Sequence, residues 1–209
     1  MKIKDNFFFQ YLLPSFLISF TYADSFNNNF YNNHGSVGLI NIPTARFFDE
    51  EVHGVTFYDG TPDQKITLTS NPYDWFEASF FYTNIQGVPY PSFEYQDYKD
   101  KGFNLKVRLK EEGSLPAIAI GLNDFAGTGF YGSEYIVSSY GINNIDFHFG
   151  IGWGQLSGDP NFKNPLSNLS DRFSNRPGGF TNRGGSFNAD KYFSGPKASH
   201  FYGISFKYN

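Results

Sequence analysis

The chain lacks cysteine altogether and has only one methionine among its 209 residues. Without cysteine this sequence forms no disulfide and carries no lipid-modified N-terminal cysteine. Beyond the first 23 residues, no segment approaches the roughly 20 consecutive apolar residues that a membrane-spanning helix needs. The net charge of −4 gives no reason to expect a nucleic-acid partner. If the chain enters a membrane, we therefore expect it to do so as strands.

Aromatic residues and glycine dominate what is present: 26 Phe, 15 Tyr and 22 Gly. Aromatic residues favour strands, and Gly together with Asn favours turns. The mean hydropathy is nevertheless negative, at −0.41. This combination suits an outer-membrane β-barrel, in which only alternate residues face lipid. It also suits a soluble periplasmic β-sandwich, so composition leaves both classes open.

The first 23 residues have the layout of a secretory signal. Residues 1–4 include two lysines, residues 7–20 are mostly apolar, and the run ends in Thr21-Tyr22-Ala23. We predict cleavage after Ala23, which leaves a mature β-domain over residues 24–209. The alternative is a membrane anchor, but the apolar run is short and interrupted for a spanning helix.

Strict alternation of apolar and polar or small residues is the main structural signal. In residues 103–110 the odd positions are apolar and the even positions are polar, and residues 117–123 and 145–153 alternate in the same way. A period of two predicts a strand with one apolar face, which needs either a second layer or a lipid bilayer. The strands expected from this pattern are 52–58, 65–70, 75–83, 103–110, 117–123, 133–139, 145–153 and 199–208.

These strands, about eight or nine in number, predict an all-β fold without amphipathic helices. We expect an antiparallel outer-membrane-type β-barrel or an open curved segment of one. Residues 154–197 form a long irregular loop and residues 87–101 a shorter one. Residues 71–74 (NPYD) predict a turn. Pro43 removes a ladder donor, so residues 34–49 form either an edge strand or an inward-folded segment.

Three basic residues, Lys106, Arg108 and Lys110, share one face of one predicted strand. A Lys or Arg facing lipid costs about 2–4 kcal/mol at the bilayer midplane, so this face is expected to point into the lumen. A basic stripe there would suit the uronate or pyruvyl groups of an acidic polysaccharide. The plainer alternative is a solvated polar face.

Alternation also places Glu77, Asp146 and His148 inward. A pair of carboxylates would suit glycoside hydrolysis only at a separation of about 5–9.5 Å, and lumen lining explains them better. The four histidines show no ligand spacing, so no metal or other cofactor is expected. Residues 127–132 spell GxGxxG, but a strand-like segment follows where a dinucleotide site needs a helix. We expect no catalytic residue and no enzymatic activity.

Aromatic residues near the predicted strand ends are expected to form the interface girdles that barrels place at the membrane surface. Sugar stacking is the functional alternative. The girdle candidates are Phe76, Tyr82, Trp153, Tyr202 and Tyr208.

Three blocks of sequence resemble the YjbH family of outer-membrane proteins tied to exopolysaccharide and capsule production. The first contains GLINIPTAR at residues 38–46, and the longest spans residues 97–139, from DYKDKGF to YIVSS. The third joins FKNPL at residues 162–166 to residues 187–208. The family's members are several times longer, so the resemblance implies an N-terminal fragment or a shortened paralogue. Some members are lipoproteins, for which this chain lacks the cysteine.

The resemblance implies a non-catalytic outer-membrane β-barrel that acts in export or assembly of exopolysaccharide or capsule in a Gram-negative bacterium. Its expected partners are outer-membrane lipid, an acidic polysaccharide and other export proteins. Two alternatives stay open at this point. One is a general diffusion porin, and the other is a soluble periplasmic β-sandwich that binds carbohydrate.

Overall fold

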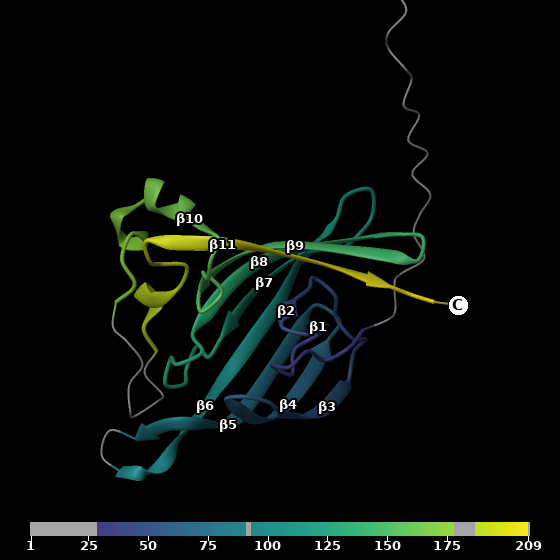
Figure 1. The fold of residues 1–209 in the computed structure, drawn as a ribbon. Coiled ribbons are helices and arrows are strands. Elements are labelled where there is room, and N and C mark those ends of the chain that lie inside the picture. Colours follow the sequence, from purple (N-terminus) through teal and green to yellow (C-terminus); the bar gives the residue numbers. More distant parts are fainter. Residues whose placement is uncertain (1–28, 91–92, 178–186, 209) are drawn as a thin grey trace, which may run out of the picture.

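The computed structural model describes residues 29–90, 93–177 and 187–208, and the predicted signal peptide lies outside them. Nine strands form one antiparallel, strongly curved sheet in the order β10-β11-β9-β8-β7-β6-β5-β4-β3 (Figure 1). Its strands are β3 (Val52–Asp59), β4 (Asp63–Tyr73), β5 (Phe76–Tyr90), β6 (Phe93–Lys110), β7 (Ala117–Asn123), β8 (Ser133–Ile142), β9 (Ile145–Gly154), β10 (Asn161–Lys163) and β11 (Lys197–Phe206).

The sheet is open. Strand β3 forms one edge, and β10 together with the rest of β11 forms the other, because β10 pairs only with residues 197–199 of β11. Among the described residues, β3 and β11 do not pair with each other. The expectation of an all-β, antiparallel fold is confirmed, in its form of an open curved segment.

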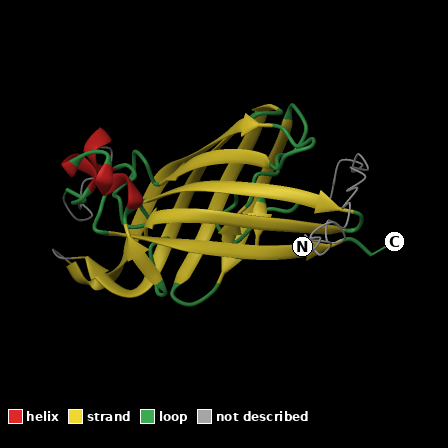
Figure 2. Ribbon diagram, turned by 90° about the horizontal axis from the view of Figure 1, so that it is seen from above, coloured by secondary structure: helices red, strands yellow, loops and turns green. Residues whose placement is uncertain are grey.

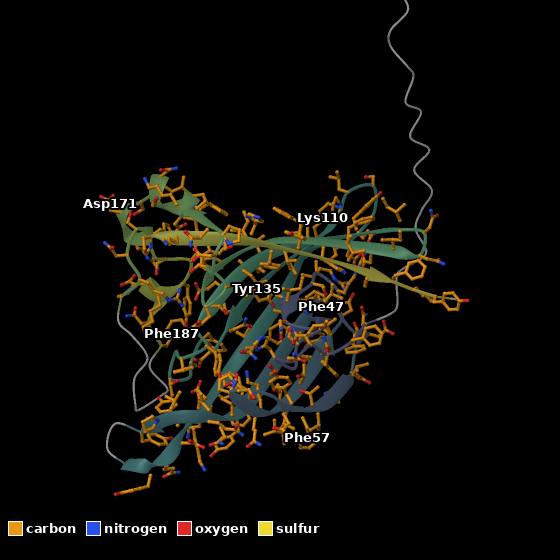
Figure 3. The ribbon with its side chains drawn as sticks, viewed as in Figure 1. Phe47, Phe57, Lys110, Tyr135, Asp171 and Phe187 are labelled. Carbon is orange, nitrogen blue, oxygen red and sulfur yellow. The ribbon has the colours of Figure 1, made fainter. Side chains whose placement is uncertain are left out.

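Alternation sorts the side chains as the sequence predicts. In β6, Phe103 is exposed on the convex face, whereas Asn104 and Lys106 are buried on the concave face. Phe57 of β3 points away from the sheet, and Phe47 lies inside its curve (Figure 3). Apolar side chains thus cover the outside of the curve and polar ones much of its inside.

The concave space is filled by the chain's own N-terminal segment, residues 29–49, which we call the plug. It contains two very short paired strands, β1 (Gly38–Leu39) and β2 (Ile42–Pro43). At one side, Gly35 lies against Thr67 of β4; at the other, Leu39 and Ile42 reach Gly203 of β11. The plug therefore bridges the curve of the sheet (Figure 1), whose strands are seen from above in Figure 2. Of the two expectations for residues 34–49, the inward-folded one is confirmed.

Two predicted connections are strands instead. Strand β4 continues through the predicted turn to Tyr73 by means of a register shift after Ser70, so the turn contains only residues 74–75. Residues 87–90 and 93–101 of the predicted loop instead extend the β5–β6 hairpin. Pro89 has no backbone N–H to donate to the ladder. The pairing shifts its register on both sides of Pro89, so the strands pair on either side of it despite the missing hydrogen bond.

Residues 154–197 are largely irregular where described, as expected. They contain β10 and three short 3₁₀ helices, η1 (Pro165–Asn168), η2 (Asp171–Phe173) and η3 (Ala189–Lys191). No helix among the described residues is long and apolar enough to cross a membrane.

The assignment of Trp153 to an exposed aromatic girdle is wrong. Its side chain has the convex parity, but it is only 2% exposed because the irregular segment folds over this end of the sheet. The indole Nε1 donates a hydrogen bond of 2.8 Å to Asn164, and Phe193 packs edge-on against the ring. Tyr82 and Tyr202 are exposed on the convex face, as a girdle requires.

Candidate functional site beneath the plug

Four of the six predicted lumen-facing residues lie under the plug on the concave face. Glu77, Lys106, Asp146 and His148 are each at most 4% exposed. They come from three strands, β5, β6 and β9, that curve around the same segment. These four side chains thus point inward as their parity predicts, and the plug, a segment of the same chain, contacts and covers them.

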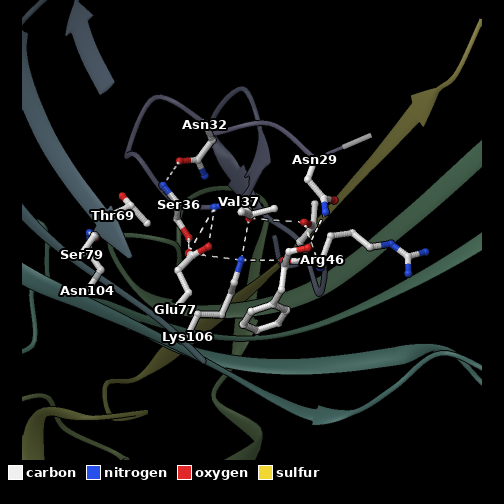
Figure 4. A network of polar contacts seen from close by, with 12 residues as sticks. Asn29, Asn32, Ser36, Val37, Arg46, Thr69, Glu77, Ser79, Asn104 and Lys106 are labelled. Atoms are coloured by element: carbon white, nitrogen blue, oxygen red, sulfur yellow. Dashed lines mark hydrogen bonds and ion pairs between the residues drawn. The ribbon is translucent and has the colours of Figure 1, made fainter. Parts of the chain in front are cut away.

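Glu77 and Lys106 are direct neighbours across the β5–β6 ladder, with 3.4 Å between Lys106 Nζ and Glu77 Oε1. Glu77 accepts the backbone N–H of Val37 at 3.2–3.3 Å and the hydroxyl of Ser36. Lys106 donates to the carbonyls of Val37 and Arg46, both at 2.9 Å. This buried ion pair therefore binds plug backbone on both sides (Figure 4).

Arg46 is the plug residue that forms ion pairs with the sheet and with the β6–β7 connection. Its guanidinium makes a fork with Asp146 of β9, at 2.7 Å from Nε and 2.6 Å from Nη2, and its Nη1 also contacts Glu112. Paired N–H donors facing a carboxylate are among the strongest hydrogen bonds in proteins. Asp146, 1% exposed, thereby has a compensating charge without which its burial would be costly.

His148 extends the same network to the backbone of the plug. Its Nδ1 lies 2.8 Å from the Ser139 hydroxyl, which accepts the N–H of Ala45 at 2.9 Å. Its Nε2 lies 3.5 Å from Asp146 Oδ2 and 3.4 Å from the Ser205 hydroxyl. The imidazole thus joins β8, β9 and β11 under the plug.

Arg108 shares the Phe47 ring with Lys106, but its ion pairs differ from those of Lys106, and Lys110 does not join them. The Arg108 guanidinium stacks 4.9 Å above the Phe47 ring and forms ion pairs of 3.2 Å with Asp74 and 3.3 Å with Glu111. Lys110 donates to the Glu111 carbonyl at the end of the strand, past a register shift. The three basic residues are therefore not gathered into one binding surface, and the polysaccharide contact predicted for them stays a prediction.

A second polar group at the plug was not found from the sequence. Lys65 of β4 lies 4.3 Å from the centre of the Tyr131 ring and 3.4 Å from Nδ1 of His34 in the plug. Burial, with the charge of Lys65, lowers the pKa of His34 to about 4, although Asp63 opposes the shift. A cavity of about 230 Å³ adjoins these side chains. No periodicity marks this site, because its members belong to strand, loop and plug.

This arrangement holds a segment of the chain in place against the sheet. Both Glu77 and Asp146 are committed to partners in the plug, so neither carboxylate is open to a substrate while the plug is seated. Within the described residues, no three His, Asp or Glu side chains are grouped to hold a metal ion. Sequence reasoning found the strand residues of the network but missed Arg46 and Ser36, whose only signal is an inward-folded segment.

Comparison with known proteins identifies relatives. The family model described as exopolysaccharide biosynthesis protein YbjH matches residues 30–209. The uncharacterized lipoprotein YjbH of Escherichia coli strain K12 is 36% identical over 178 residues, which cover 83% of this chain and 25% of the relative. The chain thus spans about a quarter of that relative's length. No solved structure matches. On the family match over residues 30–209 and this identity, the chain belongs to the YjbH family.

Proposed function

We propose that this chain forms part of an outer-membrane β-sheet wall and serves, without catalysis, in the export or assembly of exopolysaccharide. The observation that carries the proposal is the convex face. Large apolar side chains are exposed there on strands from β3 to β11, namely Val55, Phe57, Leu68, Phe80, Tyr82, Phe103, Phe147, Phe149, Tyr202, Ile204 and Phe206. The family description supplies the link to exopolysaccharide.

The register makes this band continuous. Val55, Leu68, Phe80 and Phe103 are successive cross-strand neighbours from β3 to β6. Soluble monomers rarely expose apolar patches larger than a few hundred Å². In a β-sandwich a second sheet would cover such a face, and among the described residues only the irregular segment covers one end of it. Lipid acyl chains are the environment that this surface fits.

Connection lengths suggest an orientation. At one end of the sheet the β4–β5 and β8–β9 turns each have two residues, 74–75 and 143–144. At the other end lie the long connections, residues 124–132 and the irregular segment between β9 and β11. Outer-membrane barrels place short turns in the periplasm and longer loops outside the cell. We therefore place the long-loop end at the exterior, after export by the N-terminal signal.

The seated plug argues against a general diffusion porin. A porin needs a water-filled interior, whereas here the concave face is occupied by buried ion pairs such as Lys106–Glu77 and Arg46–Asp146. The role that fits is a structural one, beside outer-membrane lipid and other export proteins, with an acidic polysaccharide as the polymer handled. A soluble carbohydrate-binding β-sandwich does not account for the convex face.

The functional test is deletion of the gene, with surface polysaccharide and uptake of small hydrophilic solutes measured in the same strains. We expect surface polysaccharide to fall, solute uptake to stay unchanged, and the intact gene to restore the polysaccharide. Unchanged polysaccharide with reduced uptake would contradict the proposal and favour the porin. Release of the protein by osmotic shock without detergent would favour the soluble β-sandwich.

A further inference from the structure

A second cavity lies at the long-loop end of the sheet, and it shares Asn123 and Gln155 with the cavity beside His34 and Lys65. Its volume is about 430 Å³, within the range of about 300–1,000 Å³ typical of small-ligand sites. Three connections form its walls: residues 124–132 after β7, residues 154–157 after β9, and residues 191–197, which lead into β11. Neither the six lumen-facing residues nor the plug contributes to it.

The cavity walls consist largely of aromatic side chains and glycine residues. Phe125 and Tyr192 come from different connections, and the Tyr192 hydroxyl donates a 2.6 Å hydrogen bond to the Phe125 carbonyl. Glycines 127, 129, 132, 154 and 195 also line the cavity. A methyl group at Gly154 would fall 2.3 Å from the Gly132 carbonyl oxygen, so glycine is needed for the connections to approach this closely. The site is therefore held together by its own contacts.

One side of the cavity is a neutralised ion pair. Glu134 accepts two hydrogen bonds of 2.7 Å from Arg176, and the N–H of Phe193 donates to the same carboxylate at 2.9 Å. Glu134 lies on β8 and is 1% exposed. Its charge is thus fully compensated, and the Glu134–Arg176 pair fixes the irregular segment against the sheet.

Two lysines of the cavity wall have no acidic partner among the described residues, so the cavity keeps a positive charge. Lys191 and Lys197 both line the cavity, and neither has an ion-pair partner within the described part of the chain. Lys197 also stands directly opposite Lys163 in the β10–β11 ladder, and like charges so placed destabilise a strand pair unless an anion bridges them. The Nζ of Lys191 lies above Gly129 and so faces the glycine-lined wall.

The one other acid in the cavity offsets little of this charge. Asp124 is 4% exposed, and its Oδ1 has no hydrogen-bond partner. Burial, reinforced by the nearby Asp100, raises the pKa of Asp124 to about 7. With this raised pKa, Asp124 carries less negative charge near neutral pH than an ordinary aspartate does.

We propose that this cavity binds a short acidic oligosaccharide whose sugars carry carboxylates. Lys191 and Lys197 would pair with the carboxylates, Phe125 and Tyr192 would contact the apolar faces of the sugar rings, and the Asn123 and Gln155 amides would meet hydroxyls. The inference rests on the proposed function, since it places a recognition site for an acidic polymer at the end of the sheet assigned to the exterior.

The test is isothermal titration of the detergent-solubilised full chain with tetragalacturonate. We expect saturable binding that weakens as salt is raised, and at least a tenfold loss of affinity in the double variant Lys191→Gln/Lys197→Gln. Tyr192→Ala should also bind more weakly, through loss of ring contact. The matched control is Lys207→Gln, an exposed lysine outside the cavity, which should bind like the parent chain. Thermal unfolding of each variant checks that the fold is kept.

Two reference ligands separate a sugar site from simple charge attraction. Uncharged maltotetraose should not bind measurably, and polyglutamate should bind much more weakly than tetragalacturonate. Absence of saturable tetragalacturonate binding, equal affinity for polyglutamate, or undiminished binding by the double lysine variant would overturn the inference. If gene deletion still lowers surface polysaccharide in that case, the proposed function stands and only the ligand site fails.

Discussion

Lys106 shows how single residues bind the plug to the sheet. Its ammonium group is 1% exposed and lies 4.5 Å from the centre of the Phe47 ring, besides its contacts with Glu77 and two carbonyls. Burying an ion is expensive unless its partners are all present, so removing one member of such a set costs more than the pair contributes.

We therefore expect Lys106→Met to lower the free energy of unfolding by about 3–5 kcal/mol, because Glu77 is left buried without its cation. The double variant Glu77→Gln/Lys106→Met should cost less than the sum of the two single changes. Urea unfolding in detergent measures both. Lys110→Met, at the end of the same strand, should change stability by no more than about 0.5 kcal/mol. Equal effects at positions 106 and 110 would refute this reading of the pair.

His34 makes the seated plug sensitive to acid. Its folded pKa of about 4 lies below the ordinary 6.5, so between these values the unfolded chain binds a proton that the folded chain does not. Stability is therefore fully present above about pH 6.5 and is lost as pH falls towards 4. Asp124, with its raised pKa, acts in the opposite direction between about pH 4 and 7.

The measurement is the urea midpoint between pH 4 and 7 for the parent chain and for His34→Gln. We expect the variant to lose less stability on acidification, because it has no imidazole to protonate beside Lys65. The Asp124 contribution is common to both proteins and cancels in the comparison. The same pH slope in both would show that His34 is not the titrating group.

At the scale of strands, the alternation of apolar and polar residues in the sequence predicts most of the strands of the sheet. It failed at two places: β4 continues through residues 71–73 by a register shift, and the β5–β6 hairpin extends past Pro89 and several polar residues. Trp153 has the predicted parity but lies beneath a segment whose folding no periodicity reveals.

For the candidate site, parity alone placed Glu77, Lys106, Asp146 and His148 on the concave face. It could not supply their partners, since Arg46 meets Asp146 across 100 residues of sequence and Ser36 meets Glu77 across 41. Such contacts depend on how the plug crosses the curve of the sheet. A strand's period reports which way a side chain points and carries no information about what fills the space.

At Gly35 the plug lies in close contact with β4. Its φ is +76°, and a methyl group there would lie 2.4 Å from Cβ of Thr67. We expect Gly35→Ala to loosen the plug, because backbone strain and the clash act together. Limited trypsin digestion should then cut after Arg46, which the Asp146 fork protects in the parent chain.

The matched control is Gly113→Ala, in the β6–β7 connection, where a methyl group meets nothing within 4 Å. This variant should resist trypsin at Arg46 as the parent chain does. Equal protection in the Gly35 and Gly113 variants would show that the plug does not depend on close contact at Gly35.

At the scale of the whole molecule, the two faces of the sheet call for different surroundings. The concave face is occupied by the plug, which forms ion pairs and hydrogen bonds with it. Among the described residues, only the irregular segment covers the convex face, at one end, and exposed aromatic and aliphatic side chains lie on this face from β3 to β11. Lipid contact on this face is the central claim, because the outer-membrane location and the orientation both depend on it.

The absence of cysteine makes that claim directly measurable, since single nitroxide labels can be attached at chosen sites in lipid vesicles. Leu68→Cys and Phe149→Cys place labels on the convex face, and Glu111→Cys places one in the water-exposed β6–β7 connection. Paramagnetic resonance then compares collisions with oxygen, which concentrates in lipid, and with a water-soluble nickel chelate. We expect oxygen to dominate at positions 68 and 149 and the nickel chelate at 111. Dominance of the nickel chelate at all three positions would contradict a lipid-facing sheet.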